Sequence, residues 1–207
     1  MRVLRYNIIH GGFKYLILLP IVIYAGAQVQ PSKFVTDMSL CPTWKEMLPQ
    51  MAIMFLVEDF FNYFIHAAMH HPLLYRFHKE HHEYKYSIPL TAWHFHYVEF
   101  VFLQLLSGQM YIMAAQAYAP VHIGTLMVWY IFRFWNNNST HCGYVFPWTP
   151  TSLIPFCLND EFHDFHHTHN SGNYGLYLRV LDVIFGTTKD YREFKAKQRK
   201  ILAAKAD

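Results

Sequence analysis

Four long apolar runs constrain the fold of this 207-residue chain more than any other feature. They cover residues 13–27, 47–69, 98–119 and 121–135. A transmembrane helix needs about 20 mainly apolar residues, within a range of roughly 17 to 25, so the second and third runs are long enough to cross a bilayer. The first and fourth runs are marginal, and only Pro120 separates the third from the fourth. We therefore expect an all-α integral membrane protein with three or four transmembrane or re-entrant helices, two of them joined in a tight hairpin.

The composition agrees with this class of protein. Hydrophobic residues make up 53% of the chain and charged residues only 15%, whereas charged residues make up about 25% of an average soluble domain. This balance excludes a disordered chain and most nucleic-acid-binding proteins, and we expect no nucleic acid partner. The three cysteines are widely spaced and form no C-x-x-C pair, so we expect neither a disulfide framework nor a cysteine zinc site.

The basic residues predict the orientation in the membrane. If the N-terminus is cytoplasmic, every Lys and Arg except Lys33 and Lys45 falls inside or at the inner membrane boundary. Cytoplasmic flanks of membrane helices collect such residues. This orientation places the two polar blocks, residues 70–96 and 136–207, on the same cytoplasmic face, where we expect a histidine-rich helical cap.

Histidine is unusually abundant, with 15 residues against 14 carboxylates. Three short clusters have regular spacing: they contain His66 and His70; His78, His81 and His82; and His163, His166 and His167. On an α-helix, residues three and four apart share one face, so we expect each cluster to aim its imidazoles at a common point. Together the clusters offer eight nitrogen ligands. Because a single zinc ion takes three or four, we predict a site for two metal ions.

Other residues are candidates for completing this site. His96 and His141 lie near the same membrane boundary and are expected as further ligands. Ligating imidazoles usually donate their second N–H to a carboxylate or amide. Glu58, Asp59 and Asn62 precede His66 at helical spacing, and we interpret them as such orienting partners; the alternative is that they pack against neighbouring helices.

Asp164, inside the third cluster, is a further candidate for orienting a ligand. A pH-sensing histidine cluster or a metal-trafficking surface remain alternatives to a bound metal centre. Imidazole also suits iron, zinc, copper and nickel alike, so the ligands do not choose the metal.

The order of these motifs resembles the fatty acid hydroxylase and sterol desaturase superfamily of membrane non-haem di-iron enzymes. The motifs are V-E-D-F-F-N-Y-F-I-H-A-A-M-H-H-P from Val57, F-H-K-E-H-H from Phe77, T-H-C-G-Y-V-F-P from Thr140, E-F-H-D-F-H-H from Glu161, S-G-N-Y-G from Ser171 and L-D-V-I-F-G-T from Leu181. The resemblance covers roughly residues 50 to 190, and its H-x-G-Y-x-F-P and H-D-x-H-H elements look most like those of C-4 methylsterol monooxygenases. Ala67, Leu181 and Tyr97 depart from the pattern of the superfamily, which bears on the identity of the substrate.

The resemblance implies an oxygen-dependent oxidoreductase of sterol biosynthesis. It implies two iron ions per chain, electrons from cytochrome b5 and its NAD(P)H-dependent reductase, and the endoplasmic reticulum membrane. We expect no catalytic group beyond the metal ligands. The expected division is an N-terminal anchor and external loop, residues 1–46, followed by a catalytic domain, residues 47–207.

Two other readings of the resemblance remain. The protein could be another lipid hydroxylase or a sterol desaturase of the same superfamily. It could also be a membrane protein that binds metal or sterol without catalysis.

Overall fold

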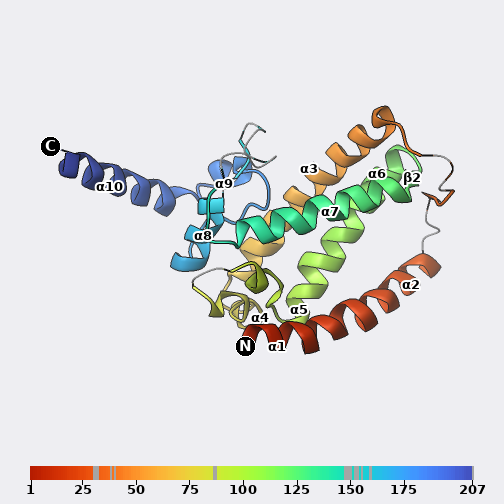
Figure 1. Ribbon diagram of the computed structural model, residues 1–207, viewed down its shortest axis with the longest axis horizontal. Coiled ribbons are helices and arrows are strands. Elements are labelled where there is room, and N and C mark those ends of the chain that lie inside the picture. The colour runs from red at the N-terminus through yellow and green to blue at the C-terminus, as the bar shows by residue number, and fades with distance from the viewer. Residues whose placement is uncertain are drawn as a thin grey trace.

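The computed structural model describes residues 1–29, 33–37, 39, 41–85, 88–146, 151, 154, 156–158 and 160–206. Almost all regular structure in this part of the chain is helical (Figure 1), which confirms the predicted all-α class. Two strands of two residues each, β1 (Phe34–Val35) and β2 (Val121–His122), pair in parallel. This pair ties the loop before the second apolar run to the turn between the third and fourth runs.

Within the described residues, three helical stretches are long and apolar enough to cross a membrane: Arg2–Tyr24, Trp44–Met69 and Tyr97–Tyr118. The first contains α1 (Arg2–Tyr6), the π-helical segments η1 (Asn7–Gly11) and η2 (Lys14–Leu18), and the start of α2 (Leu19–Val29). The second is α3 (Trp44–Met69), and the third runs through α5 (Tyr97–Glu99), π-helical η5 (Phe100–Leu106) and α6 (Ser107–Tyr118). The prediction of three or four membrane helices is therefore confirmed at its lower number.

The fourth apolar run forms α7 (Ile123–Thr140), which follows α6 after a short turn, as the hairpin prediction requires. Tyr111 on α6 packs against Trp129 on α7, with ring centroids 5.7 Å apart. Both join a buried cluster with Met54 of α3 and Tyr177. Many apolar side chains on the outer faces, such as Leu56 and Ile131, are exposed, as expected for helices that face lipid.

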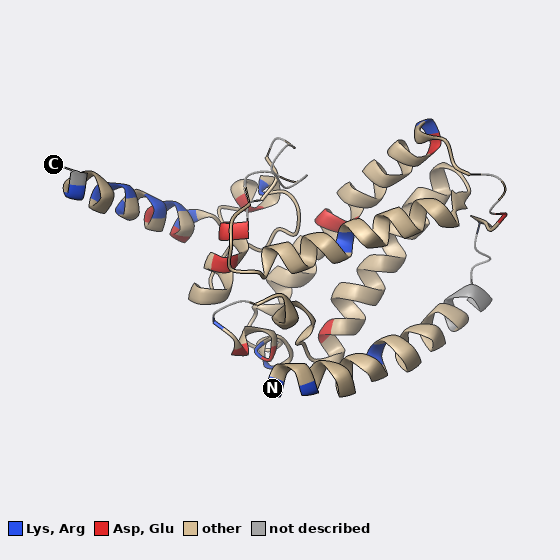
Figure 2. Cartoon of the chain, viewed as in Figure 1, with Lys and Arg blue, Asp and Glu red and all other residues tan. Residues whose placement is uncertain are grey.

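The remaining polar segments form a cap at one end of the helices (Figure 1). The cap contains α4 (Tyr75–His78), η3 (His81–Glu83), η4 (Pro89–Trp93), α8 (Asp160–His169), α9 (Val180–Ile184) and α10 (Lys189–Ala206). Figure 2 shows that charged residues gather in the cap and along α10, while few lie within the long helices.

The N-terminal helix packs directly against the cap. The Tyr6 hydroxyl donates to the carbonyl of Phe95 at 2.9 Å, and the Asn7 amide donates to the carbonyl of Leu90 at 2.7 Å. The ammonium of Lys14, which is fully buried, also donates to the Phe95 carbonyl. The segment expected as a separate anchor is thus a structural neighbour of the histidine-rich region. The division at residue 46 stays a prediction.

Candidate metal centre

Nine histidines gather into two adjacent groups at the junction of the helices and the cap. In each group, one ring nitrogen from every member lies within 4.8 Å of the others. The five-histidine group contains His66, His70, His78, His82 and His166. The four-histidine group contains His81, His141, His163 and His167. All eight cluster histidines are therefore brought together, and His141 joins them as the sequence suggested.

The structure divides the sequence clusters between the two groups. His78 and His82 enter the five-histidine group, while His81 between them enters the four-histidine group. In α8 the assignment is reversed, because His163 and His167 enter the four-histidine group and His166 the other. The expectation that each cluster aims at a common point holds for His66 and His70, which share the five-histidine group, and was wrong for the other two clusters. Residues four apart on a helix share a face more closely than residues three apart. In addition, helix α4 ends at His78 before η3 begins at His81. The middle histidine of each cluster therefore points to the other group.

Backbone carbonyls fix the orientation of four of these rings. Nδ1 of His81 lies 3.2 Å from the carbonyl oxygen of His94, and Nδ1 of His141 lies 2.8 Å from that of Asn137. In the other group, Nδ1 of His66 lies 3.0 Å from the oxygen of Tyr174, and Nδ1 of His166 lies 2.6 Å from that of Gly172. A carbonyl oxygen only accepts, so each Nδ1 carries the proton and each Nε2 presents a lone pair.

These lone pairs face one another. Nε2 of His81 and Nε2 of His141 lie 3.3 Å apart, although neither carries a proton in the neutral ring. Burial lowers the pKa of His141 to about 4 and holds the pKa of His81 well below its usual value. Protonation at neutral pH therefore does not relieve the repulsion. A cation between the two nitrogens would do so.

The spacing of the nitrogens fits a shared metal ion. Two imidazole nitrogens bound about 2.0–2.1 Å from one zinc-sized ion, at tetrahedral or octahedral angles, lie about 2.9–3.4 Å apart. The Nε2 atoms of His163 and His167 lie 3.1 Å apart, and each is within 3.2 Å of Nε2 of His141. In the other group, Nε2 of His78 lies 3.2 Å from Nε2 of His66 and 3.0 Å from Nε2 of His82. The residues present therefore fit two metal ions, one in each group.

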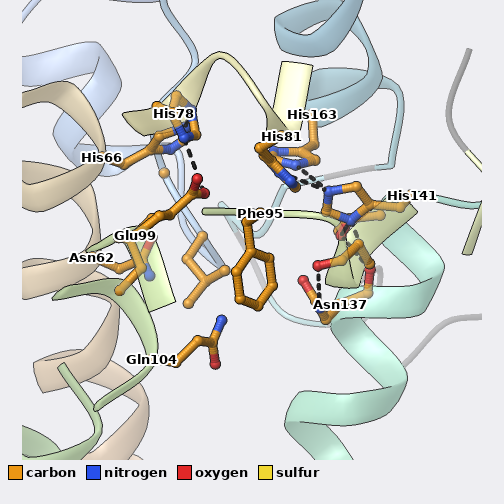
Figure 3. A pocket seen from close by; sticks show the side chains of 15 residues that line it. Asn62, His66, His78, His81, Phe95, Glu99, Gln104, Asn137, His141 and His163 are labelled. Carbon is orange, nitrogen blue, oxygen red and sulfur yellow. Dashed lines mark hydrogen bonds and ion pairs between the residues drawn. The ribbon is translucent and has the colours of Figure 1, made fainter. Parts of the chain in front are cut away.

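Glu99 provides a carboxylate partner that sequence reasoning missed. Its Oε1 atom lies 3.0 Å from Nδ1 of His78, and both side chains are buried (Figure 3). Glu99 stands at the start of the third candidate span, far in sequence from any histidine cluster. Its acidic character at a membrane boundary was the available signal.

Asp182 shapes the loop that supplies two of the carbonyls. Its carboxylate is fully buried and accepts the backbone N–H groups of Tyr174 and Gly175, both at 2.8 Å, and the hydroxyl of Thr187 at 2.6 Å. Gly172 in this loop has a φ of +58°, and a Cβ there would lie 2.1 Å from the carbonyl oxygen of Thr187. Only glycine fits at that point. The motifs from Ser171 and Leu181 thus build the support for His66 and His166.

The structure gives two of the predicted orienting residues other partners. Oε1 of Glu58 lies 2.6 Å from a guanidinium nitrogen of Arg133, and its Oε2 accepts the Tyr177 hydroxyl at 3.0 Å. Asp59 accepts the backbone N–H groups of Tyr177 and Leu178 at 2.7 and 3.0 Å. Their positions on α3, two turns before His66, keep both carboxylates from the imidazoles. They instead tie α3 to α7 and to the segment after α8.

The other predicted residues have different outcomes. His96 belongs to neither group, because its Nδ1 accepts the backbone N–H of Val98 at the start of α5. Asn62 lines a pocket with His66 and His78. Asp164 lies on α8 beside His163, and its orienting role stays a prediction. Pro147, the last residue of the motif that contains His141, lies outside the described residues.

Two cavities meet beside the imidazoles. A small one of about 60 Å³ borders both histidine groups and Phe95. A larger one of about 560 Å³ lies among the N-terminal helix, η5, α6 and α7. Its lining is mainly apolar and includes Leu19, Ile23 and Phe134, and its volume is in the range of small-molecule sites.

Comparison with known proteins identifies the family. The model of the family described as fatty acid hydroxylase matches residues 51–187, about two thirds of the chain. The chain belongs to the fatty acid hydroxylase family. The matched region contains every histidine of both groups, Glu99 and Asp182.

Curated relatives within this family have two kinds of name. Very-long-chain aldehyde decarbonylase GL1-8 of Oryza sativa subsp. indica is 37% identical over 163 residues, which cover 77% of this chain and 59% of the relative. In Arabidopsis thaliana, methylsterol monooxygenase 2-2 is 36% identical over 74% of this chain and 58% of its own length. Methylsterol monooxygenase 1-1 is 36% identical over 73% of this chain and 50% of its own length.

The chain thus spans between half and three fifths of the length of these relatives. No solved structure matches it.

Proposed function

We propose that this protein is a membrane di-iron oxygenase that oxidises a lipid. The observation that carries the proposal is the pairing of unprotonated Nε2 atoms within each buried histidine group, at distances that fit ligands of a shared ion. Nine neutral imidazoles suit iron as well as zinc, so the metal is inferred from the family rather than from the ligands. Bound iron would supply the activation of dioxygen and the oxidation of a C–H bond.

The chain's own residues hold and shield such a centre. The five-histidine and four-histidine groups would each bind one ion, and the backbone carbonyls of Gly172, Tyr174, His94 and Asn137 keep the rings turned inward. Phe95, which is buried, lines the small cavity beside the imidazoles (Figure 3). The apolar surroundings exclude water from the reacting carbon, which limits side reactions.

A sterol is the substrate that the observations favour, with C-4 methylsterol oxidation as the reaction. The motif from Thr140 and the relatives named methylsterol monooxygenases support it. The cavity among the helices could take a bulky apolar molecule that enters from the bilayer. Decarbonylation of a very-long-chain aldehyde is the second candidate, favoured by the relatives that are named decarbonylases.

The cellular setting is part of the same proposal. We propose the endoplasmic reticulum membrane on the basis of the family resemblance alone, and the cytoplasmic face for the cap on the basis of the Lys and Arg distribution. Electrons would come from a cytochrome b5-type donor and its NAD(P)H-dependent reductase. The basic α10, which extends from the cap (Figure 2), offers a surface for contact with such a donor.

Metal analysis tests the centre. The protein is purified in detergent without oxygen, and iron and zinc are counted per chain. We expect two irons in the parent, one each in His82→Ala and His163→Ala, and two in the control His96→Ala, because His96 belongs to neither group. A parent that binds no metal while folded would contradict the di-iron proposal.

Lipid analysis tests the reaction. Sterols and aldehydes are profiled in cells that lack the protein and in cells complemented with the parent or with His81→Ala. We expect 4-methyl sterols to accumulate without the protein and to disappear only with the parent. Accumulation of long-chain aldehydes with normal sterols would favour the second candidate.

A further inference from the structure

The wall between the two cavities contains an unusual set of side chains. Four of the described residues line both cavities: Asn62, Gln104, Asn137 and Leu176. Three of the four carry a primary amide, although the rest of the larger cavity is mainly apolar. Figure 3 shows the three amides around Phe95, below the imidazoles in that view.

The amides have hydrogen-bonding capacity to spare. Among the described residues, the amide of Asn62 makes no hydrogen bond, although the residue is only 7% exposed and lines both cavities. Gln104 uses its oxygen to accept from Arg133 at 3.1 Å, which leaves its NH₂ group available. Asn137 reaches the carbonyl of Ala92 only at 3.5 Å, the limit of a hydrogen bond. A buried amide without partners is costly unless a ligand satisfies it.

Helical spacing sets the distance from these amides to the metal ligands. Asn62 precedes His66 by four residues on α3, and Asn137 precedes His141 by four residues on α7. Four residues correspond to a rise of about 6 Å along a helix. A hydrogen bond from an amide takes up about 3 Å of this distance. The remaining distance of about 3 Å is about the span of one or two carbon–carbon bonds, so an oxygen bound to the amides would lie that close to a carbon placed at the imidazoles.

The nearby ion pair is a poorer candidate for binding a polar group. Glu58 and Arg133 lie one further turn away on the same two helices, about 12 Å from the histidines. Their charges already satisfy each other, with Arg133 Nε 2.7 Å from Glu58 Oε1. A substrate held there would be oxidised at a carbon remote from its polar end.

We propose that Asn62, Gln104 and Asn137 bind a neutral oxygen of the substrate, a hydroxyl or a carbonyl, that lies one or two carbons from the carbon to be oxidised. The apolar body of the molecule fills the larger cavity. This inference rests on the proposed oxidation of a lipid. It specifies a substrate class, namely bulky lipids oxygenated next to the reacting carbon.

Equilibrium binding of two labelled sterols to the detergent-purified protein tests the inference. The probes are a 4,4-dimethylsterol with a 3-hydroxyl group and its 3-deoxy analogue. We expect the parent to bind the hydroxysterol about tenfold more tightly, the effect of roughly 1.4 kcal/mol of hydrogen bonding. Asn62→Leu and Asn137→Leu should each reduce the ratio to about threefold or less.

Asn136→Leu is the matched control. Asn136 is buried and lines the larger cavity but not the smaller one, so its replacement should leave the ratio unchanged. Iron content reports whether each variant is folded, and if Asn62→Leu fails to fold, Asn137→Leu gives the same comparison.

The outcomes separate the two proposals. Equal affinity of the iron-loaded parent for the two sterols would overturn the role of the amides and leave the oxygenase proposal standing. Failure of that protein to bind either sterol would overturn the proposed sterol substrate together with this inference. An unchanged ratio in both leucine variants would place the oxygen elsewhere in the cavity and would also overturn the inference.

Discussion

Replacing Asp182 with asparagine should weaken one metal site and leave the other intact. The Asp182 carboxylate holds the loop whose carbonyls at Gly172 and Tyr174 orient His166 and His66. Both of these histidines belong to the five-histidine group. The four-histidine group takes its carbonyl partners from other segments, so it should not respond.

The structure gives the size of the effect. In Asp182→Asn, the amide oxygen can still accept from Tyr174 and Thr187, but the new NH₂ group faces the buried N–H of Gly175. An unsatisfied buried donor costs about 1–3 kcal/mol. If this cost reaches the two imidazoles, the metal affinity of the five-histidine group falls about 10- to 100-fold, in the range found when supporting residues are lost.

The assay is stepwise removal of iron by a chelator, with the iron that remains per chain measured at each concentration. The parent should lose its two irons within a narrow range of chelator concentration, while Asp182→Asn should lose one iron at a 10- to 100-fold lower concentration. Asp190→Asn, the same change at an exposed carboxylate that contacts Ser171 of this loop, should behave as the parent. Loss of both irons together from a folded Asp182→Asn protein, or no change, would refute the reasoning.

Other perturbations have defined outcomes. Arg133→Met should lower the free energy of unfolding in mixed micelles by about 3 kcal/mol, because it leaves the Glu58 carboxylate buried and unpaired; adding Glu58→Leu should recover part of the loss, and a further loss would contradict this. Gly172→Ala should destabilise the protein by more than about 1 kcal/mol because of its positive φ and the contact with Thr187, whereas Gly12→Ala, which has open space around it, should not. The metal-free protein should lose stability as the pH falls from 6.5 to about 4. In this range the unfolded chain binds protons on its histidines, whereas buried imidazoles of the folded protein stay neutral, as His141 does with its pKa lowered to about 4. Denaturant titration across that range measures the change, and a flat profile would argue against buried neutral imidazoles.

Several parts of the fold could be predicted because they depend on local properties of the chain. The second and third apolar runs gave two of the three membrane-length helices and the hairpin at Pro120, since a helix of about 20 apolar residues has few alternatives. The first run was marginal, and the helix that contains it begins earlier, at Arg2. The histidine spacing gave eight of the nine gathered imidazoles. The position of His141 at the end of the fourth apolar run was enough to predict it as a ninth metal ligand. His96 had the same kind of position, and nothing local revealed that its ring caps α5 instead.

Long-range partners could not be predicted in the same way. Glu58 and Asp59 have the spacing of carboxylates that orient histidine ligands. In the structure, however, Glu58 pairs with Arg133, and Asp59 accepts the backbone N–H groups of Tyr177 and Leu178. Glu99 lies 21 residues from the His78 imidazole that it meets. Such pairings depend on how helices pack, and helix packing is set by surfaces that sequence spacing alone does not describe.

The sequence by itself determined that this chain forms membrane helices and gathers histidines for metal, because helix periodicity and hydrophobic length act over a few turns. Only the tertiary structure decided which histidine belongs to which group. His81 and His82 are neighbours in the chain and lie in different groups. The physical reason is that a side chain's direction follows from the local backbone, whereas the point at which several directions meet follows from the packing of α3, α7, α8 and the cap against one another.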